Sequence, residues 1–196
     1  MSKLTDEELK RLQELNGIVN GTLNNMGVLE IQKQDQIKKY NEAFGRFKGT
    51  YSATATKHGV DNVPTDEHLE VMKVTADKLF EPLREFVGGA IRVNSFYRSQ
   101  DLNALLKGGA RRSQHMKGEA MDLDALGGRS NAEMFMIIKD QLDFDQLIWE
   151  GGNNSEPEWV HVSYVSEKKN RKQILKMVRK GSGISYRLFD GCKTCS

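Results

Sequence analysis

The sequence has no long apolar run and little net charge. No stretch of the 196-residue chain approaches the roughly 18 to 20 apolar residues that a membrane-spanning helix needs. The N-terminal segment MSKLTDEELKRLQEL lacks the apolar stretch of a secretory signal, so we expect the protein to be made in a cytoplasm. A net charge of only +2 argues against a dedicated nucleic-acid binder.

Cysteine is also scarce. Both cysteines, Cys192 and Cys195, lie in the C-terminal segment GCKTCS. A lone Cys-x-x-Cys could pair or bind a metal, but without a second pair we interpret residues 191–196 as a polar tail. The hydrophobic fraction of 38% and the charged fraction of 29% are those of a globular protein with a proper core.

Basic side chains are concentrated near the C-terminus. The segment from Lys168 to Lys180 contains seven lysines and arginines and no acidic residue. Such a run is most often the solvated face of a helix, and attraction to an anionic polymer is the alternative.

The first part of the chain predicts a helical extension, residues 1–48. Thr5 and Glu8 form a plausible capping box at the start of its first helix. A second polar helix carries a narrow apolar seam, which could pack on the main domain or pair with a second copy as a short coiled coil. The seam consists of Ile37, Tyr40, Phe44 and Phe47.

The composition changes at about Tyr51, and residues 51–190 predict an α+β domain in which helices flank a small antiparallel sheet. A helix follows Pro64 and ends at Gly88 and Gly89, with Leu69, Met72, Leu79 and Leu83 facing the core. The strands expected are AIRVNS, GEAMDLD, FDQLIWE and EWVHVSYV, and the other helices are SQDLNALLK, NAEMFMIIKDQ and the basic NRKQILKMVRK.

The segment SQHMKGEAMDLD places His115 and Asp122 seven residues apart around Gly118. This is not the i, i+4 spacing of a helical zinc site, but a turn through Gly118 can fold the histidine back toward the aspartate. Taken alone, the pair is weak evidence for a metal.

A second polar pair strengthens the metal hypothesis. His161 is embedded in the apolar strand EWVHVSYV, and Glu158 would point to the opposite face of an ideal strand. The difficulty disappears if Glu158 lies in the loop that enters the strand, which Pro157 favours. Two histidines and a carboxylate form a three-ligand set, which is typical of catalytic zinc, and Glu158 is the candidate to take a proton from water.

These residues resemble a known motif. The segment SQHMKGEAMD is similar to Ser-x-His-x-x-Gly-x-Ala-x-Asp of the zinc D-Ala-D-Ala carboxypeptidase family, and EWVH resembles its Glu-x-x-His element. VNSFYRS and LFEPLRE match as well, so the resemblance covers roughly Tyr51 to Asp190. The family includes vancomycin-resistance D-Ala-D-Ala dipeptidases and phage endolysins, and it shares its fold with the hedgehog signalling domain.

The resemblance implies one Zn²⁺ per chain, bound by His115, Asp122 and His161. It also implies that Glu158 is the general base and later the acid. These roles suit the chemistry, because zinc lowers the pKa of a bound water and a carboxylate can carry its proton to the leaving amine.

Two further positions carry over from the family. Arg98 occupies the place of the substrate-polarising arginine, whose fixed charge would stabilise an oxyanion. Ser113 would line the substrate pocket. Phe96 departs from the pattern, since many relatives have glycine there, and the exact substrate is therefore open.

The activity that the resemblance implies is hydrolysis of a peptide bond in the peptidoglycan stem peptide. Removal of terminal D-Ala and cleavage between L-Ala and D-Glu both stay open. The missing signal peptide favours a phage endolysin or virion-associated protein, made in the host cytoplasm and acting on the wall after release or carried in a virion. A cytoplasmic dipeptidase is the remaining alternative. We expect no nucleic-acid partner, and residues 1–48 would serve self-association or virion attachment.

A different class of function is a zinc-containing binding or structural module, because hedgehog relatives keep the metal without being conventional peptidases. Loss of Glu158 or Arg98 would favour this interpretation. Both residues are present, so the sequence favours the enzyme.

Overall fold

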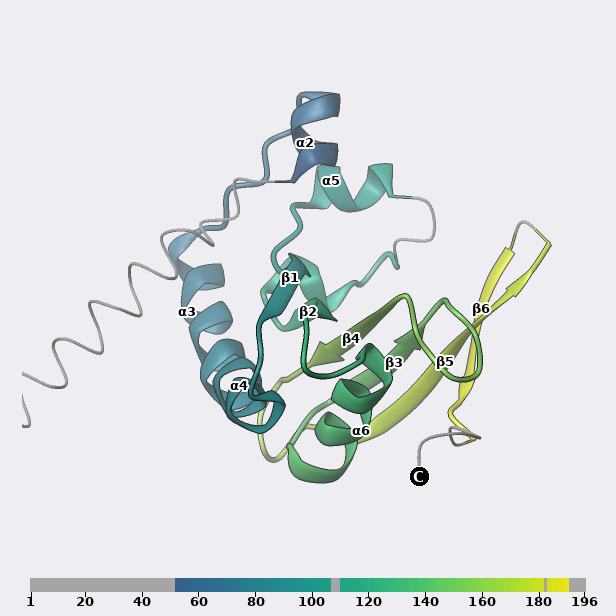
Figure 1. The fold of residues 1–196 in the computed structure, drawn as a ribbon. Coiled ribbons are helices and arrows are strands. Elements are labelled where there is room, and N and C mark those ends of the chain that lie inside the picture. Colours follow the sequence, from purple (N-terminus) through teal and green to yellow (C-terminus); the bar gives the residue numbers. More distant parts are fainter. Residues whose placement is uncertain (1–51, 107–109, 182, 191–196) are drawn as a thin grey trace, which may run out of the picture. The chain divides into compact units, whose positions relative to one another are not determined.

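The computed structural model describes residues 52–106, 110–181 and 183–190, and Figure 1 draws their helices and strands. The α-helices are α2 (Ala53–His58), α3 (Asp66–Thr75), α4 (Glu81–Val87), α5 (Gln100–Leu105) and α6 (Asn131–Gln141), with a π-helical turn η1 (Ala76–Phe80) and a 3₁₀ turn η2 (Gln114–Lys117). The strands are β1 (Ile91–Ser95), β2 (Ala120–Ala125), β3 (Gln146–Glu150), β4 (Trp159–Ser163), β5 (Gln173–Lys180) and β6 (Gly183–Leu188). The predicted α+β class is confirmed. The predictions for residues 1–48 and for the two cysteines fall outside the described residues.

The first long helical segment runs through α3, η1 and α4 without interruption. Thr65 begins it, because its hydroxyl accepts a hydrogen bond from the backbone N–H of His68 at 3.3 Å. Gly88 ends it in the left-handed region, with φ of 63°, as the glycine pair in the sequence predicts. Of the apolar residues expected to face the core, Met72, Leu79 and Leu83 are fully buried, while Leu69 is half-buried.

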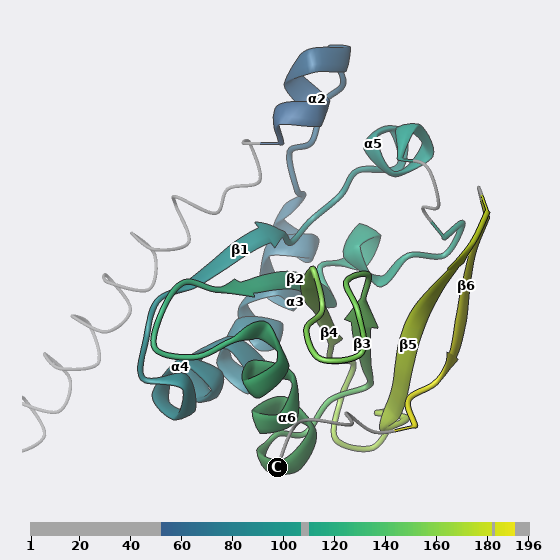
Figure 2. The same cartoon turned by 45° about the vertical axis from the view of Figure 1, so that its right-hand side comes forward.

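Six strands form one sheet in the order β1-β2-β4-β3-β5-β6. Neighbouring strands are antiparallel except β3 and β5, which are parallel. Figure 2 shows β5 and β6 as a hairpin at one edge of the sheet and β1 at the other. The strands β2, β4 and β3 therefore lie in the middle of the sheet.

The helix α6 packs on one face of this sheet (Figure 1). Its start carries a capping box between Ser130 and Glu133. The ring of Phe135 meets the fully buried ring of Trp149 edge to face, with 5.3 Å between centroids. Burial of each large apolar side chain here contributes about 1.5–3 kcal/mol to stability. Adjacent residues of a strand point to opposite faces, so Ile148 and Glu150 project from the face opposite α6.

The prediction of a basic helix over residues 170–180 is wrong, because Gln173–Lys180 form the strand β5. The apolar residues of this segment fit one face of a helix as well as they fit a strand, and pairing with β3 and β6 decides between the two. Nor is the whole basic run solvated, since Lys176 is buried with its Nζ 5.0 Å from the centre of the Trp149 ring. The parallel pairing also makes the sheet mixed, where an antiparallel one was expected.

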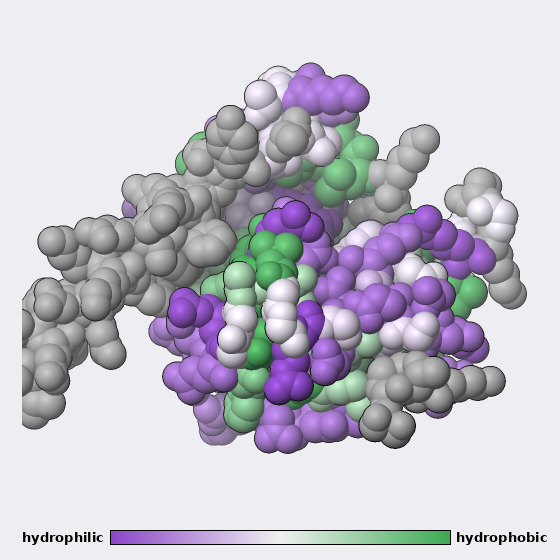
Figure 3. Space-filling view, viewed as in Figure 1, coloured by the Kyte–Doolittle hydropathy of each residue, from purple (hydrophilic) through white to green (hydrophobic). Residues whose placement is uncertain are grey.

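The surface visible in Figure 3 is mainly hydrophilic, with a group of hydrophobic residues near its centre. Within the described ranges, no helix combines the length and the apolar character that crossing a membrane requires.

Candidate active site

The middle strands of the sheet bring Asp122 and His161 together. Asp122 of β2 lies directly opposite His161 of β4, and His161 lies opposite Ile148 of β3. Directly opposed residues of an antiparallel pair project from the same face. The aspartate and the histidine therefore share the face of the sheet that α6 does not cover.

His115 reaches the same point through a tight turn. It lies in η2, and Gly118 follows with φ of 75°, a conformation that favours glycine. A Cβ at Gly118 would lie 2.6 Å from Cγ of Met72 and 3.0 Å from the carbonyl oxygen of His68, so the position also requires the absence of a side chain. The hydroxyl of Thr75 donates to the carbonyl of Gly118 at 2.9 Å and so attaches the turn to α3. The turn predicted around Gly118 is confirmed.

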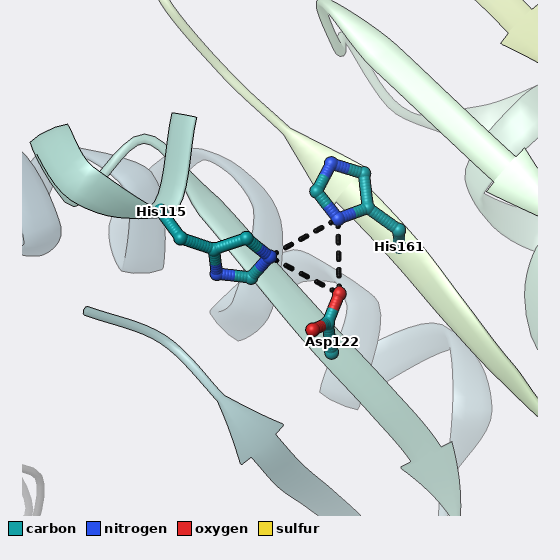
Figure 4. Close-up of side chains that lie close together, drawn as sticks. All are labelled: His115, Asp122 and His161. Atoms are coloured by element: carbon teal, nitrogen blue, oxygen red, sulfur yellow. Dashed lines mark hydrogen bonds and ion pairs between the residues drawn. The ribbon is translucent and has the colours of Figure 1, made fainter. Parts of the chain in front are cut away.

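The three side chains converge on one small volume (Figure 4). Nε2 of His115 lies 3.2 Å from Oδ1 of Asp122 and 3.2 Å from Nδ1 of His161. Nδ1 of His161 lies 2.9 Å from the same Asp122 oxygen. One ligand atom from each residue lies within 4.8 Å of the other two, and all three residues are buried. The separation of the atoms is that of groups able to bind one metal ion.

Hydrogen bonding prepares His115 to act as a ligand. Its Nδ1 lies 2.7 Å from the carbonyl oxygen of Phe96, so the ring donates its proton there and keeps the Nε2 lone pair for the cluster. The backbone N–H of Arg98 donates to the carbonyl of His115 at 3.2 Å. Phe96, the position that departs from the family pattern, thus orients a cluster residue through its main chain.

The ionisation of the cluster suits a cation. Burial lowers the pKa of His115, although Asp122 acts in the opposite direction. Burial alone would raise the pKa of Asp122, but the charges and hydrogen bonds of the two histidines hold it well below its usual range. Metal binding requires a neutral imidazole and an ionised carboxylate. The donor set of two imidazole nitrogens and one carboxylate oxygen therefore fits zinc.

Arg98 adjoins the cluster. Its Nη2 forms a short ion pair with Oδ2 of Asp122, the oxygen that faces away from the histidines, and its Nε donates to Oγ of Ser95 at 2.8 Å. The arginine side chain is only 16% exposed. It therefore holds the Asp122 carboxylate in orientation, in addition to carrying the positive charge that the sequence predicts at the site.

Glu158 and Ser113 do not join the converging atoms. Glu158 directly precedes β4, as Pro157 predicts, but its side chain is 45% exposed and its Oε2 pairs with Nη2 of Arg179 at 2.9 Å. The carboxylate lies over Gly151, where an added Cβ would be 2.5 Å from Oε2. Ser113 precedes η2 and is half-buried, with no hydrogen bond from its side chain to the turn.

Sequence reasoning missed Glu150, which lies on the same face as His161. Glu150 ends β3, two residues beyond Ile148, and is 7% exposed. The hydroxyl of Tyr186 donates to its Oε1 at 3.4 Å. The sequence offers no local signal for this placement, because it depends on the register between β3 and β4.

Asp145 is a second group that the sequence analysis does not identify, and it stabilises η2. Asp145 is buried and accepts hydrogen bonds from Nε and Nη2 of Arg171 at 2.9 and 2.6 Å and from Nε2 of Gln114 at 3.0 Å. Since Gln114 immediately precedes His115, this network connects the histidine's turn to the start of β3 and to the loop before β5.

Comparison with known proteins agrees with this geometry. A search of curated proteins finds no match to the chain. The family model described as Peptidase M15 matches residues 44–163, which are more than half of the 196 residues and include all three residues of the cluster. The match confirms the resemblance drawn from the motif, and the chain belongs to the Peptidase M15 family.

Proposed function

We propose that the protein is a zinc-dependent peptidase that hydrolyses a peptide bond of the peptidoglycan stem peptide. Membership of a metallopeptidase family supports the reaction class. The observation that carries the proposal is the convergence of His115 Nε2, Asp122 Oδ1 and His161 Nδ1. Three protein ligands leave a fourth position of zinc for water or substrate, as catalytic sites require.

The chain's own residues divide the remaining work. Bound zinc would supply Lewis acidity and an activated water. Glu158 is proposed as the base that takes a proton from the attacking water, for which its carboxylate must leave Arg179. Arg98 would stabilise the negative charge on the carbonyl oxygen of the substrate. Ser113, at the start of η2, is proposed to contact the peptide.

Two finer assignments belong to the same proposal. The enzyme removes terminal D-Ala or cleaves between L-Ala and D-Glu, and it acts as a phage endolysin or a virion-associated wall-degrading protein. Exposed basic residues support contact with an anionic wall. They include Arg111 and Arg112, which directly precede Ser113 in the sequence, and Lys168 and Lys169, which lie in the loop before β5.

The test is digestion of purified peptidoglycan followed by mass spectrometry of the products, with zinc content measured on the same sample. We expect about one zinc per chain and a new amino terminus or a released D-Ala that identifies the cleaved bond. Zinc binding without any peptide product would refute the enzyme and favour the non-catalytic module of the same fold. Peptide cleavage that persists after complete removal of metal would refute the role of zinc.

A further inference from the structure

The pairing of β2 with β4 ends two residues short of Glu158. The last partners in this ladder are Leu123 of β2 and Val160 of β4. Continued by two residues, the same antiparallel register places Ala125 of β2 opposite Glu158. The main chains of these two residues therefore face each other at the point where the ladder stops.

The side chain of Asn131, the first residue of α6, fills this place. Its Oδ1 accepts a hydrogen bond from the backbone N–H of Ala125 at 2.7 Å, and its Nδ2 donates to the carbonyl oxygen of Glu158 at 3.1 Å. The same nitrogen lies 3.3 Å from Oδ1 of Asp124 and 3.4 Å from the carbonyl oxygen of Pro157. A carboxamide offers the donor and the acceptor of a peptide group, so Asn131 extends the ladder from the end of β2 to the residue that enters β4.

Two further contacts hold the same segment. The carboxylate of Glu156 accepts hydrogen bonds from the backbone N–H groups of Asn131 at 2.8 Å and Ala132 at 3.3 Å, at the end of α6 that favours a negative charge. The backbone N–H of Glu158 donates to the carbonyl of Glu150 at 2.9 Å. The main chain of Glu158 is thus bound to β3 through its N–H and to Asn131 through its carbonyl.

We propose that Asn131 is a positioning residue, which fixes the place of the Glu158 carboxylate relative to the three metal ligands through the main chain of Glu158. The inference rests on the proposed function, in which Glu158 is the base. Its exposed side chain releases Arg179 in that reaction, so the main-chain contacts are what locate the carboxylate. A base must come within hydrogen-bond distance of the attacking water, and a displacement of about 1 Å can cost about 100-fold in rate.

The first experiment removes the amide donor in two ways. Asn131→Ala deletes the whole carboxamide. Asn131→Asp keeps the oxygen that accepts from Ala125 and puts a second oxygen against the carbonyl of Glu158. Both variants should lower kcat by about tenfold or more on the stem peptide that contains the bond identified by digestion. Their KM and zinc content should equal those of the parent, because the ligands and the rest of the site are unchanged.

A double-mutant cycle tests whether Asn131 acts through Glu158. Glu158→Gln alone should lower kcat by about 100-fold. Adding Asn131→Ala to Glu158→Gln should change kcat by less than about twofold, since there is no longer a base to misplace. General damage to the fold would instead lower the rate by the same factor in both backgrounds.

Ser130→Ala is the matched control for the stability of the same helix end. The hydroxyl of Ser130 accepts from the backbone N–H of Glu133 at 3.1 Å and caps α6. Its loss should lower the unfolding midpoint by about 2–4 °C and leave kcat at the parent value. A lower midpoint alone would therefore not account for the slow turnover of the Asn131 variants.

The inference is overturned if both Asn131 variants keep the parent kcat, if their rate loss is as large in the Glu158→Gln background, or if it accompanies a loss of zinc. It is also overturned if Ser130→Ala is equally slow. Asn131→Asp carries the test alone if the alanine variant does not fold, and failure of both to fold would assign Asn131 to stability only. These outcomes leave the proposed function intact, provided that the parent cleaves the peptide. A parent protein that binds zinc and cleaves nothing would overturn the proposed function, and this assignment with it.

Discussion

Replacing Gly118 by alanine tests how the fold positions His115. At φ of 75°, any residue other than glycine costs about 1–2 kcal/mol. The new Cβ would also lie 2.6 Å from Cγ of Met72 and 3.0 Å from the carbonyl oxygen of His68. Met72 is fully buried and the carbonyl belongs to α3, so neither can move away freely, and such overpacking typically costs about 1–3 kcal/mol.

The expected total for Gly118→Ala is therefore about 2–5 kcal/mol of unfolding free energy, a large part of the roughly 5–15 kcal/mol of a typical domain. Displacement of η2 from α3 would also move His115 away from the cluster. We expect zinc affinity to fall together with stability. Urea unfolding and zinc titration on the same preparations measure the two effects.

Gly88→Ala is the matched control. Gly88 has a similar φ of 63°, but nothing lies within 4 Å of an added Cβ. The control should lose only the conformational part, about 1–2 kcal/mol, and keep its zinc. If Gly118→Ala is no less stable than Gly88→Ala and binds zinc as the parent does, the packing of the turn against α3 does not position the histidine.

Three other predictions follow from the site and its support. His161→Ala should lose most of its zinc, and removing the metal from the parent with a chelator should lower its unfolding midpoint, because binding free energy is partly folding free energy; a midpoint unchanged by chelation would argue against the site. Glu158→Gln should keep zinc and lose about 100-fold of turnover, measured on peptidoglycan, whereas a parent rate would end its role as base. Burial alone would raise the pKa of Asp145, but hydrogen bonds from Arg171 and Gln114 hold it below its usual range. A carboxyl whose pKa is lower in the folded than in the unfolded protein stabilises the fold at any pH above its unfolded-state pKa of about 4. This stabilisation disappears as the pH falls through the folded-state pKa. Asp145→Asn should therefore be less stable at pH 7 by about 1.5–3 kcal/mol, and the deficit should shrink below about pH 4 in urea unfolding; a deficit independent of pH would contradict the charge argument.

The part of the site that the sequence predicts is the part encoded locally. His115, Gly118 and Asp122 lie in one short segment, and their spacing around a glycine describes a turn that needs no other element to define it. The ends of the first long helical segment are also encoded locally. The side chain of Thr65 caps its start, and Gly88 ends it by adopting the left-handed backbone conformation.

The parts that the sequence does not predict depend on pairing between distant strands. Residues 173–180 carry apolar side chains at spacings that suit either a helix or a strand, and pairing with β3 on one side and β6 on the other makes them a strand. Glu150 looks like the polar end of an apolar strand until its register with β4 places it on the same face as His161. The partner Tyr186 comes from β6, which lies beyond the matched residues 44–163.

Strand pairing also explains why the cluster should report on the integrity of the whole domain. His115 and Asp122 are seven residues apart, but His161 is 46 residues from His115 and 39 from Asp122. The distant histidine meets the other two only while β2 and β4 keep their register, with α6 and β3 lying between them in the sequence. A metal that bridges these residues closes long loops in the chain and so opposes unfolding, because a preformed three-ligand site does not exist in the unfolded state. Substitutions that slip this register should therefore lose zinc even where they leave all three ligands unchanged.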